Sequence, residues 1–103
     1  MKLYQFNIPT ATNRGASYEK QRKLWERKAL ELAGGYTERG FHVGVWQGSR
    51  LFRETIAVYE VACEKPTAQA LLDEAFSLFT DQEAIFYAEL GTARIAERPE
   101  AER

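Results

Sequence analysis

The apolar and polar residues of the chain follow two periods, one typical of strands and one typical of helices. Residues 2–8 alternate, with Tyr4, Phe6 and Ile8 on one side, which predicts a half-buried strand. Residues 68–79 instead carry apolar side chains at the spacings i, i+3, i+4, i+7, i+8 and i+11, the clearest helical signal in the sequence. The two periods together predict a chain of mixed strands and helices.

Two more segments complete the predicted order of elements. A helix is expected from Tyr18 to about Ala33, capped by Ser17 and ended by Gly34-Gly35, where glycine accepts a left-handed dihedral. A last strand is expected from Glu83 to Ile95. With two central strands, the order is β-α-β-β-α-β. This order predicts a ferredoxin-like α+β fold, a four-stranded antiparallel sheet with two helices on one face.

Residues 41–63 are expected to form the hairpin of the two central strands. Gly48-Ser49 predicts a two-residue type II′ turn, in which glycine supplies a positive φ, and this turn sets Gln47 opposite Arg50. The predicted core face then consists of Phe41, Val43, Val45, Phe52, Ile56 and Val58. The mixed aromatic and polar face consists of His42, Trp46, Arg53, Thr55 and Tyr59. A longer turn is the alternative, and a shift of one residue would move one strand's side chains to the opposite face.

Length and composition indicate one soluble globular domain, since the chain has 103 residues, of which 45% are hydrophobic and 28% charged. We expect a single domain over residues 1–96 and a mobile charged tail over residues 97–103. In the predicted topology the second and fourth strands are the sheet edges. The last strand contains AIFYAEL, which is apolar on both faces, so it predicts pairing with another copy and a homodimer or larger assembly.

Charge and cysteine content argue against several classes of protein. The net charge of −1 gives no basic field for nucleic acid, and the basic run from Lys20 to Lys28 is better explained as a solvated helix face. One cysteine, Cys63, and one histidine make neither a disulfide nor a metal framework, and no cofactor is expected. Because neither a signal-peptide pattern nor a membrane-length segment is visible, we expect a cytoplasmic protein without membrane contact.

Three loops are predicted to meet at one end of the sheet, namely the loop after the first strand, the hairpin turn and the end of the second helix. Together they bring in Thr10, Asn13, Arg14, Trp46, Arg50, Arg53, Asp81 and Gln82. Asn13-Arg14-Gly15 precedes a helix N-terminus, where an anion is favoured. The favoured interpretation of the same residues is a plain turn, shaped by Asn13 and Gly15 and followed by a capping Ser17.

A family resemblance is carried by the runs IPTATNRG, LAGGYT, GVW and DQEAIF, which follow in this order between Ile8 and Ile95. They resemble a group of small uncharacterised proteins of bacteria and their phages. The resemblance implies an α+β fold and draws attention to the end of the sheet that holds Asn13, Trp46 and Gln82. It implies no catalytic role.

The function predicted from these features is that of a small non-enzymatic protein that self-associates and binds an anionic or aromatic ligand, with a nucleotide as the best candidate. Trp46 would stack on the ring, Arg53 and Arg14 would meet the charge, and Asn13 and Gln82 would orient the ligand by hydrogen bonds. Tyr59 and His42 lie on the predicted face of Trp46 and belong to the same candidate site. The same aromatic and arginine residues would also suit a dimer interface.

Two alternatives come from other classes of protein. The first is a dimeric α+β barrel enzyme that oxygenates a phenolic substrate without a cofactor, in a pocket lined by His42, Trp46, Tyr59 and Tyr87. It is weakened because His42 is the only histidine and has no evident acid or base partner. The second is a protein-binding adaptor, such as a phage protein that acts on a host factor.

Overall fold

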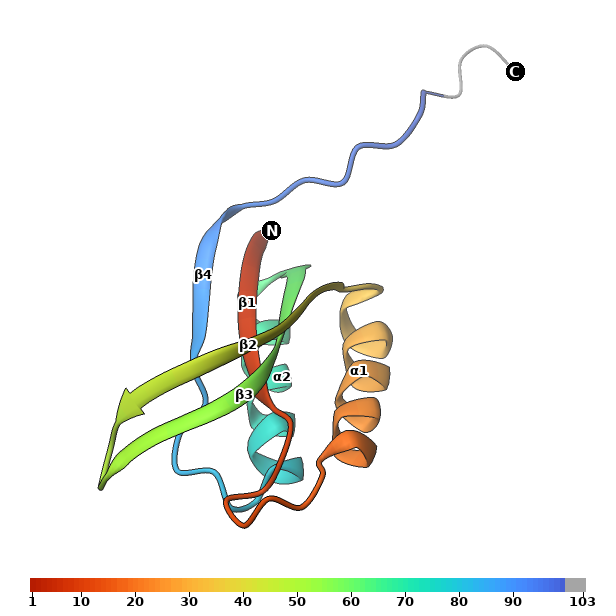
Figure 1. Cartoon of the computed structure of the whole chain (residues 1–103). Helices are drawn as coiled ribbons and strands as arrows, with labels where there is room; N and C mark the ends of the chain where they lie inside the picture. Colours follow the sequence, from red (N-terminus) through yellow and green to blue (C-terminus); the bar gives the residue numbers. More distant parts are fainter. Residues whose placement is uncertain (100–103) are drawn as a thin grey trace.

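The computed structural model describes residues 1–99 and contains four strands and two helices. In chain order these are β1 (Lys2–Pro9), α1 (Glu19–Ala33), β2 (Thr37–Gln47), β3 (Leu51–Cys63), α2 (Lys65–Leu78) and β4 (Tyr87–Thr92). The strands form one antiparallel sheet in the order β2-β3-β1-β4, and both helices pack on one of its faces (Figure 1). The predicted ferredoxin-like α+β fold is confirmed.

The helices begin and end where local chemistry requires it. Pro66 lies in the first turn of α2, where its missing N–H group would have had no helical partner in any case. Helix α1 ends at Gly34, whose φ is 82° and whose N–H group donates to the carbonyl oxygen of Leu30 at 3.0 Å. The predicted Ser17 cap is wrong by one position, because the residue that precedes α1 is Tyr18, which forms no side-chain cap hydrogen bond, although Ser17 Oγ does accept the N–H of Glu19 at 3.0 Å.

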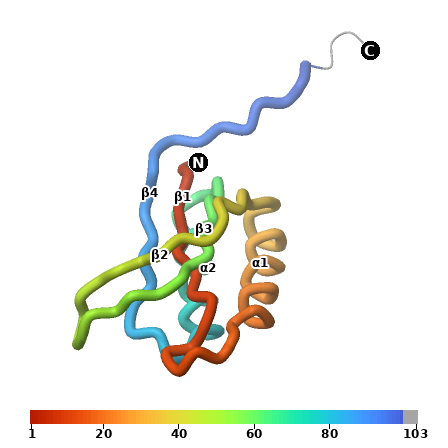
Figure 2. The backbone as a smooth tube through the Cα atoms, in the orientation of Figure 1, coloured from red at the N-terminus to blue at the C-terminus, as the bar shows by residue number. Residues whose placement is uncertain are grey.

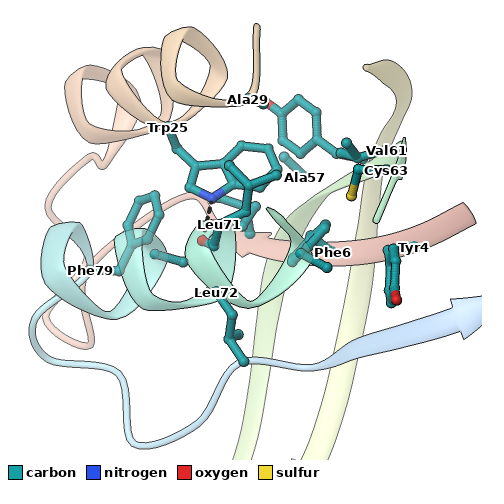
Figure 3. Close-up of a cluster of buried hydrophobic side chains, with 14 of the residues drawn as sticks. Tyr4, Phe6, Trp25, Ala29, Ala57, Val61, Cys63, Leu71, Leu72 and Phe79 are labelled. Carbon is teal, nitrogen blue, oxygen red and sulfur yellow. Dashed lines mark hydrogen bonds between the residues drawn. The ribbon is translucent and has the colours of Figure 1, made fainter. Parts of the chain in front are cut away.

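Trp25 is at the centre of the hydrophobic core between the helices and the sheet (Figure 3). Its ring packs against Phe6 of β1 and Tyr59 of β3, with centroids 5.4 and 5.1 Å away. Its indole Nε1–H donates to the carbonyl oxygen of Leu71 at 3.0 Å, so the only polar atom of the ring is satisfied inside the core. One side chain of α1 therefore joins both central strands and α2.

The predicted register of the hairpin is wrong by one residue. Gln47 lies opposite Leu51 and Trp46 opposite Phe52, so the turn contains three residues, Gly48 to Arg50. Side chains alternate across β3, so this shift exchanges its two faces. Tyr59 and Ala57 belong to the core with Tyr4, Phe6 and Ile8, whereas Ile56 and Val58 lie on the face without helices, here called the open face.

The hairpin extends beyond the two helices and crosses toward the side of β4, as the ribbon and the backbone tube show (Figures 1 and 2). Its turn contacts the segment between α2 and β4, because Ser49 Oγ donates to Glu83 Oε1 at 2.7 Å. Ile56 and Val58 are only 7% and 8% exposed although no helix covers them. The curled hairpin and the 82–86 segment therefore shelter part of the open face.

The last strand is shorter than predicted. Residues 83–86 form no strand, although Asn7 N–H donates to the carbonyl oxygen of Phe86 at 3.0 Å, and β4 ends at Thr92. Residues 93–99 form no regular element and lead away from the sheet (Figure 2). The remainder of the predicted tail, residues 100–103, lies outside the described residues. Within residues 1–99 no helix has the length and apolar character needed to cross a membrane.

The central position of Trp25 can be tested by replacement with phenylalanine. Trp25→Phe removes the hydrogen bond to Leu71 and leaves a small cavity, so the free energy of unfolding should fall by about 1–3 kcal/mol. Urea denaturation followed by circular dichroism measures this change. Trp46→Phe is the matched control, since Trp46 is only partly buried and outside the core cluster, and a loss as large as that of Trp25→Phe would contradict the assignment.

Candidate ligand-binding site

Asp81 joins three segments at the end of the sheet where the loops were predicted to meet. Its Oδ2 accepts the backbone N–H of Asn13 at 2.7 Å, and its Oδ1 accepts the hydroxyl of Tyr18. The side-chain amide of Asn13 donates to the carbonyl oxygen of Asp81 at 2.9 Å. The loop after β1 is thus bonded to the segment that follows α2, so two of the three loops predicted to meet lie together here, and the hairpin turn reaches the same segment through Ser49 and Glu83.

Gln82 belongs to the same network. Its Nε2 donates to Asp81 Oδ1 at 3.0 Å and to Asn13 Oδ1 at 3.4 Å. Burial alone would raise the pKa of Asp81, but the hydrogen bonds from Tyr18, Asn13 and Gln82 outweigh it and hold the pKa below its ordinary value. Asn13 therefore acts first as a structural residue, because both its amide groups bind Asp81.

A hollow of about 300 Å³ lies on the open face, between the curled hairpin and the segment that follows Asp81. We call it the Trp46 hollow. It is lined by Asn7, Pro9, Gly44, Val45, Trp46, Glu54, Ile56, Gln82, Ala84, Ile85 and Phe86. Apolar and aromatic side chains predominate, with a few polar groups at defined places, which is the usual composition of a small-molecule site.

The Trp46 ring is held by contacts within the hairpin. It stacks on Phe52, its cross-strand partner, with centroids 4.5 Å apart and planes inclined by 10°. A Cβ atom added at Gly48 would lie 2.5 Å from the Cζ3 atom of Trp46. Gly48 has no positive φ, so the reason predicted for this glycine was wrong. Its role is to leave room for the indole.

Among the residues of the described range 1–99 that line the Trp46 hollow, Glu54 is the one with an ionisable side chain. Burial raises the pKa of Glu54 above its ordinary value, while hydrogen bonding to Trp46 opposes this increase and the charge of Asp81 adds to it. Among the described residues that line the hollow there is no lysine, arginine or histidine. A group bound beside Glu54 is therefore favoured if it donates hydrogen bonds or carries positive charge.

A second, more polar hollow of about 400 Å³ adjoins the first and is called the Arg50 groove. It is lined by Thr10, Ala11, Thr12, Asn13, Gly15, Arg50, Leu51, Phe52, Arg53, Glu54 and Thr55. Glu54 borders both hollows, because β1 pairs with β3 only as far as Ile56 and leaves the edge of β3 free beyond it. At this free edge of β3, Thr10 Oγ1 donates to the carbonyl oxygen of Thr55 at 2.7 Å.

The predicted site residues do not all line one hollow in the structure. Trp46 and Gln82 line the Trp46 hollow, whereas Asn13 and Arg53 line the Arg50 groove. Arg53 lies opposite Val45, so it is on the other face of the hairpin from Trp46. Arg14 is exposed in the loop after β1 and lines neither hollow.

Tyr59 and His42 lie away from both hollows. Tyr59 is 2% exposed in the core, its hydroxyl donates to Glu26, and burial followed by this hydrogen bond raises its pKa well above the usual range. His42 is exposed, with Nε2 3.1 Å from the carbonyl oxygen of Arg39. Tyr87 lies opposite Phe6 on the helix side. The barrel-enzyme pocket predicted from His42, Trp46, Tyr59 and Tyr87 is therefore wrong, since two of the four residues face the helices.

The sequence analysis named only Trp46 and Gln82 as site residues among those that line this hollow, and the lining residues it missed include Asn7, Glu54 and Phe86. Glu54 was paired with Val43 in the shifted register, which hid that it shares a face with Gly44 and Trp46. The alternation of Asn7 with the buried residues of β1 was visible in the sequence and could have placed it on the open face. Phe86 gave no such signal, because it lies just before the first residue of β4.

Comparison with known proteins adds no further constraint on this site: neither the protein-family models nor the curated proteins that were searched gave a match. Within residues 1–99, no group of three or more histidine, cysteine, aspartate or glutamate side chains is arranged to hold a metal ion.

The contact between Gly48 and Trp46 can be tested with Gly48→Ala. The added methyl group should displace the indole, shift Trp46 fluorescence to longer wavelength and lower the stability by about 1 kcal/mol. Trp25 is fully buried, so its emission should stay constant. Gly35→Ala is the control, because no atom lies within 4 Å of its added Cβ and its φ is not positive. An unchanged spectrum for Gly48→Ala would contradict the contact.

The Asp81 network predicts a pH dependence of stability. Because the folded-state pKa of Asp81 is lowered, its contribution is complete above the ordinary pKa of 3.8 and is lost as the pH falls through the folded value. Asp81→Asn should therefore be less stable than the wild type at neutral pH and approach it in acid. Urea denaturation between pH 2 and 7 measures the difference. Asp73→Asn, an exposed carboxylate on α2, should leave the pH profile unchanged.

Proposed function

We propose that the protein is a non-enzymatic binding protein that holds a planar aromatic ligand in the Trp46 hollow. The observation that carries this proposal is a hollow of about 300 Å³ whose walls include Trp46, Ile56 and Phe86. A volume and a lining of this kind suit a small ring system. Binding is favoured over catalysis because Glu54 is the single ionisable group among the described lining residues.

The polar groups of the hollow indicate which chemical groups the buried part of the ligand carries. Glu54 and the side-chain oxygens of Asn7 and Gln82 can accept hydrogen bonds, and within residues 1–99 no basic side chain lines the hollow. The buried part of the ligand is therefore a ring that carries N–H donors, such as the amino edge of a nucleobase. This differs from the sequence-based expectation, in which Arg53 and Arg14 supplied positive charge next to Trp46.

An anionic part of the same ligand would be accommodated in the Arg50 groove. The two hollows adjoin at Glu54, and the groove offers the guanidinium groups of Arg50 and Arg53. Arginine forms paired hydrogen bonds with phosphate oxygens. A nucleotide with its base in the Trp46 hollow and its phosphate in the adjoining Arg50 groove is thus the ligand class that we propose. We also place the protein in the cytoplasm, as the sequence analysis expected.

Calorimetric titration with the four ribonucleoside monophosphates and the corresponding nucleosides tests the proposal. Trp46→Leu should weaken binding by about tenfold or more, the usual effect of losing one base-stacking aromatic residue. Glu54→Gln should weaken the binding of bases with an amino group more than the binding of uridine, which offers a single ring N–H donor. Arg53→Gln should lower the affinity for the monophosphates and leave the affinity for the nucleosides unchanged.

A matched control is available on the opposite side of the molecule. Leu30→Gln replaces a residue that is 53% exposed on α1, so ligand affinity should not change. Absence of heat with every member of the panel, together with unchanged Trp46 fluorescence on ligand addition, would refute nucleotide binding. Equal weakening by Trp46→Leu and Leu30→Gln would refute the role of the hollow.

A further inference from the structure

The helix side of the sheet carries a hollow that the proposed nucleotide site does not use. It measures about 360 Å³, and we call it the Tyr4 hollow. It is lined by Tyr4 of β1, by Tyr87 and Glu89 of β4, and by Lys65, Ala68 and Gln69 of α2. Tyr4 belongs to the core on the helix side, whereas the Trp46 hollow lies on the open face, so the sheet separates the two hollows.

The pairing of β1 with β4 brings the strand residues of this hollow together. Tyr4 lies opposite Glu89, and Phe6 lies opposite Tyr87. Residues that are directly opposite one another share a face of the sheet, so Glu89 and Tyr87 are on the helix side with Tyr4. Tyr87 is still 40% exposed, because α2 does not extend fully over the edge strand. The hollow is therefore open to solvent between α2 and β4.

The hydroxyl group of Tyr4 has no hydrogen-bond partner among residues 1–99, although it is buried and the residue is only 3% exposed. The ring points away from Trp25, toward the side of β4 (Figure 3). Burial, followed by the charge of Glu89, raises the pKa of this hydroxyl, which agrees with a position close to Glu89. A buried hydroxyl without a partner is unfavourable, so native proteins rarely keep one unless another group completes the hydrogen bond.

Two opposite charges line this hollow without being paired to one another. Lys65 comes from α2 and Glu89 from β4, both are exposed, and within residues 1–99 neither belongs to a salt bridge. Glu64, which also raises the pKa of Tyr4, is already 3.4 Å from the N-terminal ammonium group. A simple anion would meet Glu89 and a simple cation would meet Lys65. A small molecule that carries both charges complements the hollow best.

We propose that the Tyr4 hollow binds a free α-amino acid with an apolar side chain. Glu89 and the Tyr4 hydroxyl accept hydrogen bonds from its ammonium group, and Lys65 pairs with its carboxylate. The ring of Tyr87 and the methyl group of Ala68 are the apolar surface for the side chain. Lys65 and Glu89 are long and unbranched, so they can move aside to admit the ligand without a change in the backbone. This inference is independent of the proposed nucleotide site.

Titration calorimetry of the full chain with leucine and phenylalanine tests the proposal. The wild type should bind them, and Tyr4→Phe should lower the affinity by about tenfold or more, the expected effect of losing a hydrogen bond to a charged group. The absence of heat with both amino acids at millimolar concentration would overturn the proposal. An affinity of Tyr4→Phe equal to that of the wild type would also overturn it.

Urea denaturation without ligand distinguishes this role of the Tyr4 hydroxyl from a structural one. Tyr4→Phe should be no less stable than the wild type, because the hydroxyl has no partner to lose. Tyr18→Phe is the matched control, since its hydroxyl is bonded to Asp81, and it should lose stability but keep its affinity for leucine. A Tyr4→Phe variant destabilised as much as Tyr18→Phe would show that the hydroxyl is already paired, and would overturn the inference.

Leucine derivatives test the two charged contacts separately. Leucinamide lacks the carboxylate and N-acetyl-leucine lacks the ammonium group, so both should bind more weakly than leucine. Lys65→Met should lower the affinity for leucine but not for leucinamide, and Glu89→Gln should lower it for leucine but not for N-acetyl-leucine. Lys20→Met, at an exposed lysine of α1, is the control without effect. Equal affinity of the wild type for leucine and for either derivative would overturn the zwitterionic ligand, and unchanged nucleotide binding by these variants would keep the two sites distinct.

Discussion

The Asp81 carboxylate is the interaction on which the candidate site depends. It accepts hydrogen bonds from the Asn13 backbone N–H, the Tyr18 hydroxyl and the side-chain amide of the neighbouring Gln82. Because these bonds fix the end of α2 against the loop after β1, they also fix where the next residues begin. Residues 82–86 then form one wall of the Trp46 hollow. An acidic side chain without a direct place in the hollow thus determines its position.

The opposite wall depends on the hairpin. The Trp46 ring stacks on Phe52 and occupies the space that a side chain at Gly48 would take. The hairpin turn is hydrogen-bonded to Glu83 through Ser49. These contacts make the hairpin curl over the open face, where an uncurled sheet would present only a flat surface. The hollow is therefore formed by one element bending toward another, while the helices stabilise the sheet from behind through Trp25.

Much of the fold was contained in the sequence. The alternation in β1 and the helical period of α2 are local signals, because each buries one face against the core, and both predictions were confirmed. The predicted topology also placed Asn13 and Asp81 at the same end of the sheet, where they are hydrogen-bonded in the structure. The hairpin register was predicted wrongly because Gly48 was taken as a source of positive φ, whereas the indole of Trp46 requires the missing side chain. Such a contact between residues is not visible in the turn sequence itself.

That single shift also explains why the candidate site was only partly predictable. In the observed register Tyr59 lies in the core, Arg53 lies on the opposite face from Trp46, and Glu54 lies on the same face as the indole, whereas the predicted register gave the reverse for each. A register is decided by packing on both faces together, so a prediction from turn chemistry alone fixes it poorly. The residues that topology places, Asn13 and Gln82, did not depend on the register and were located correctly.

The alternation of β2 has a thermodynamic consequence. Gly44 and Trp46 line the hollow, whereas Phe41 and Val43 are exposed on the other side of the strand, and Val45 lies on that side but also borders the hollow. The two surfaces share one backbone, so anything that alters the twist of the strand from one side is felt on the other. Coupling free energies are reciprocal. A ligand in the hollow that favours one twist of β2 would therefore change the affinity of the opposite surface for anything that contacts it, and the same factor would apply in reverse.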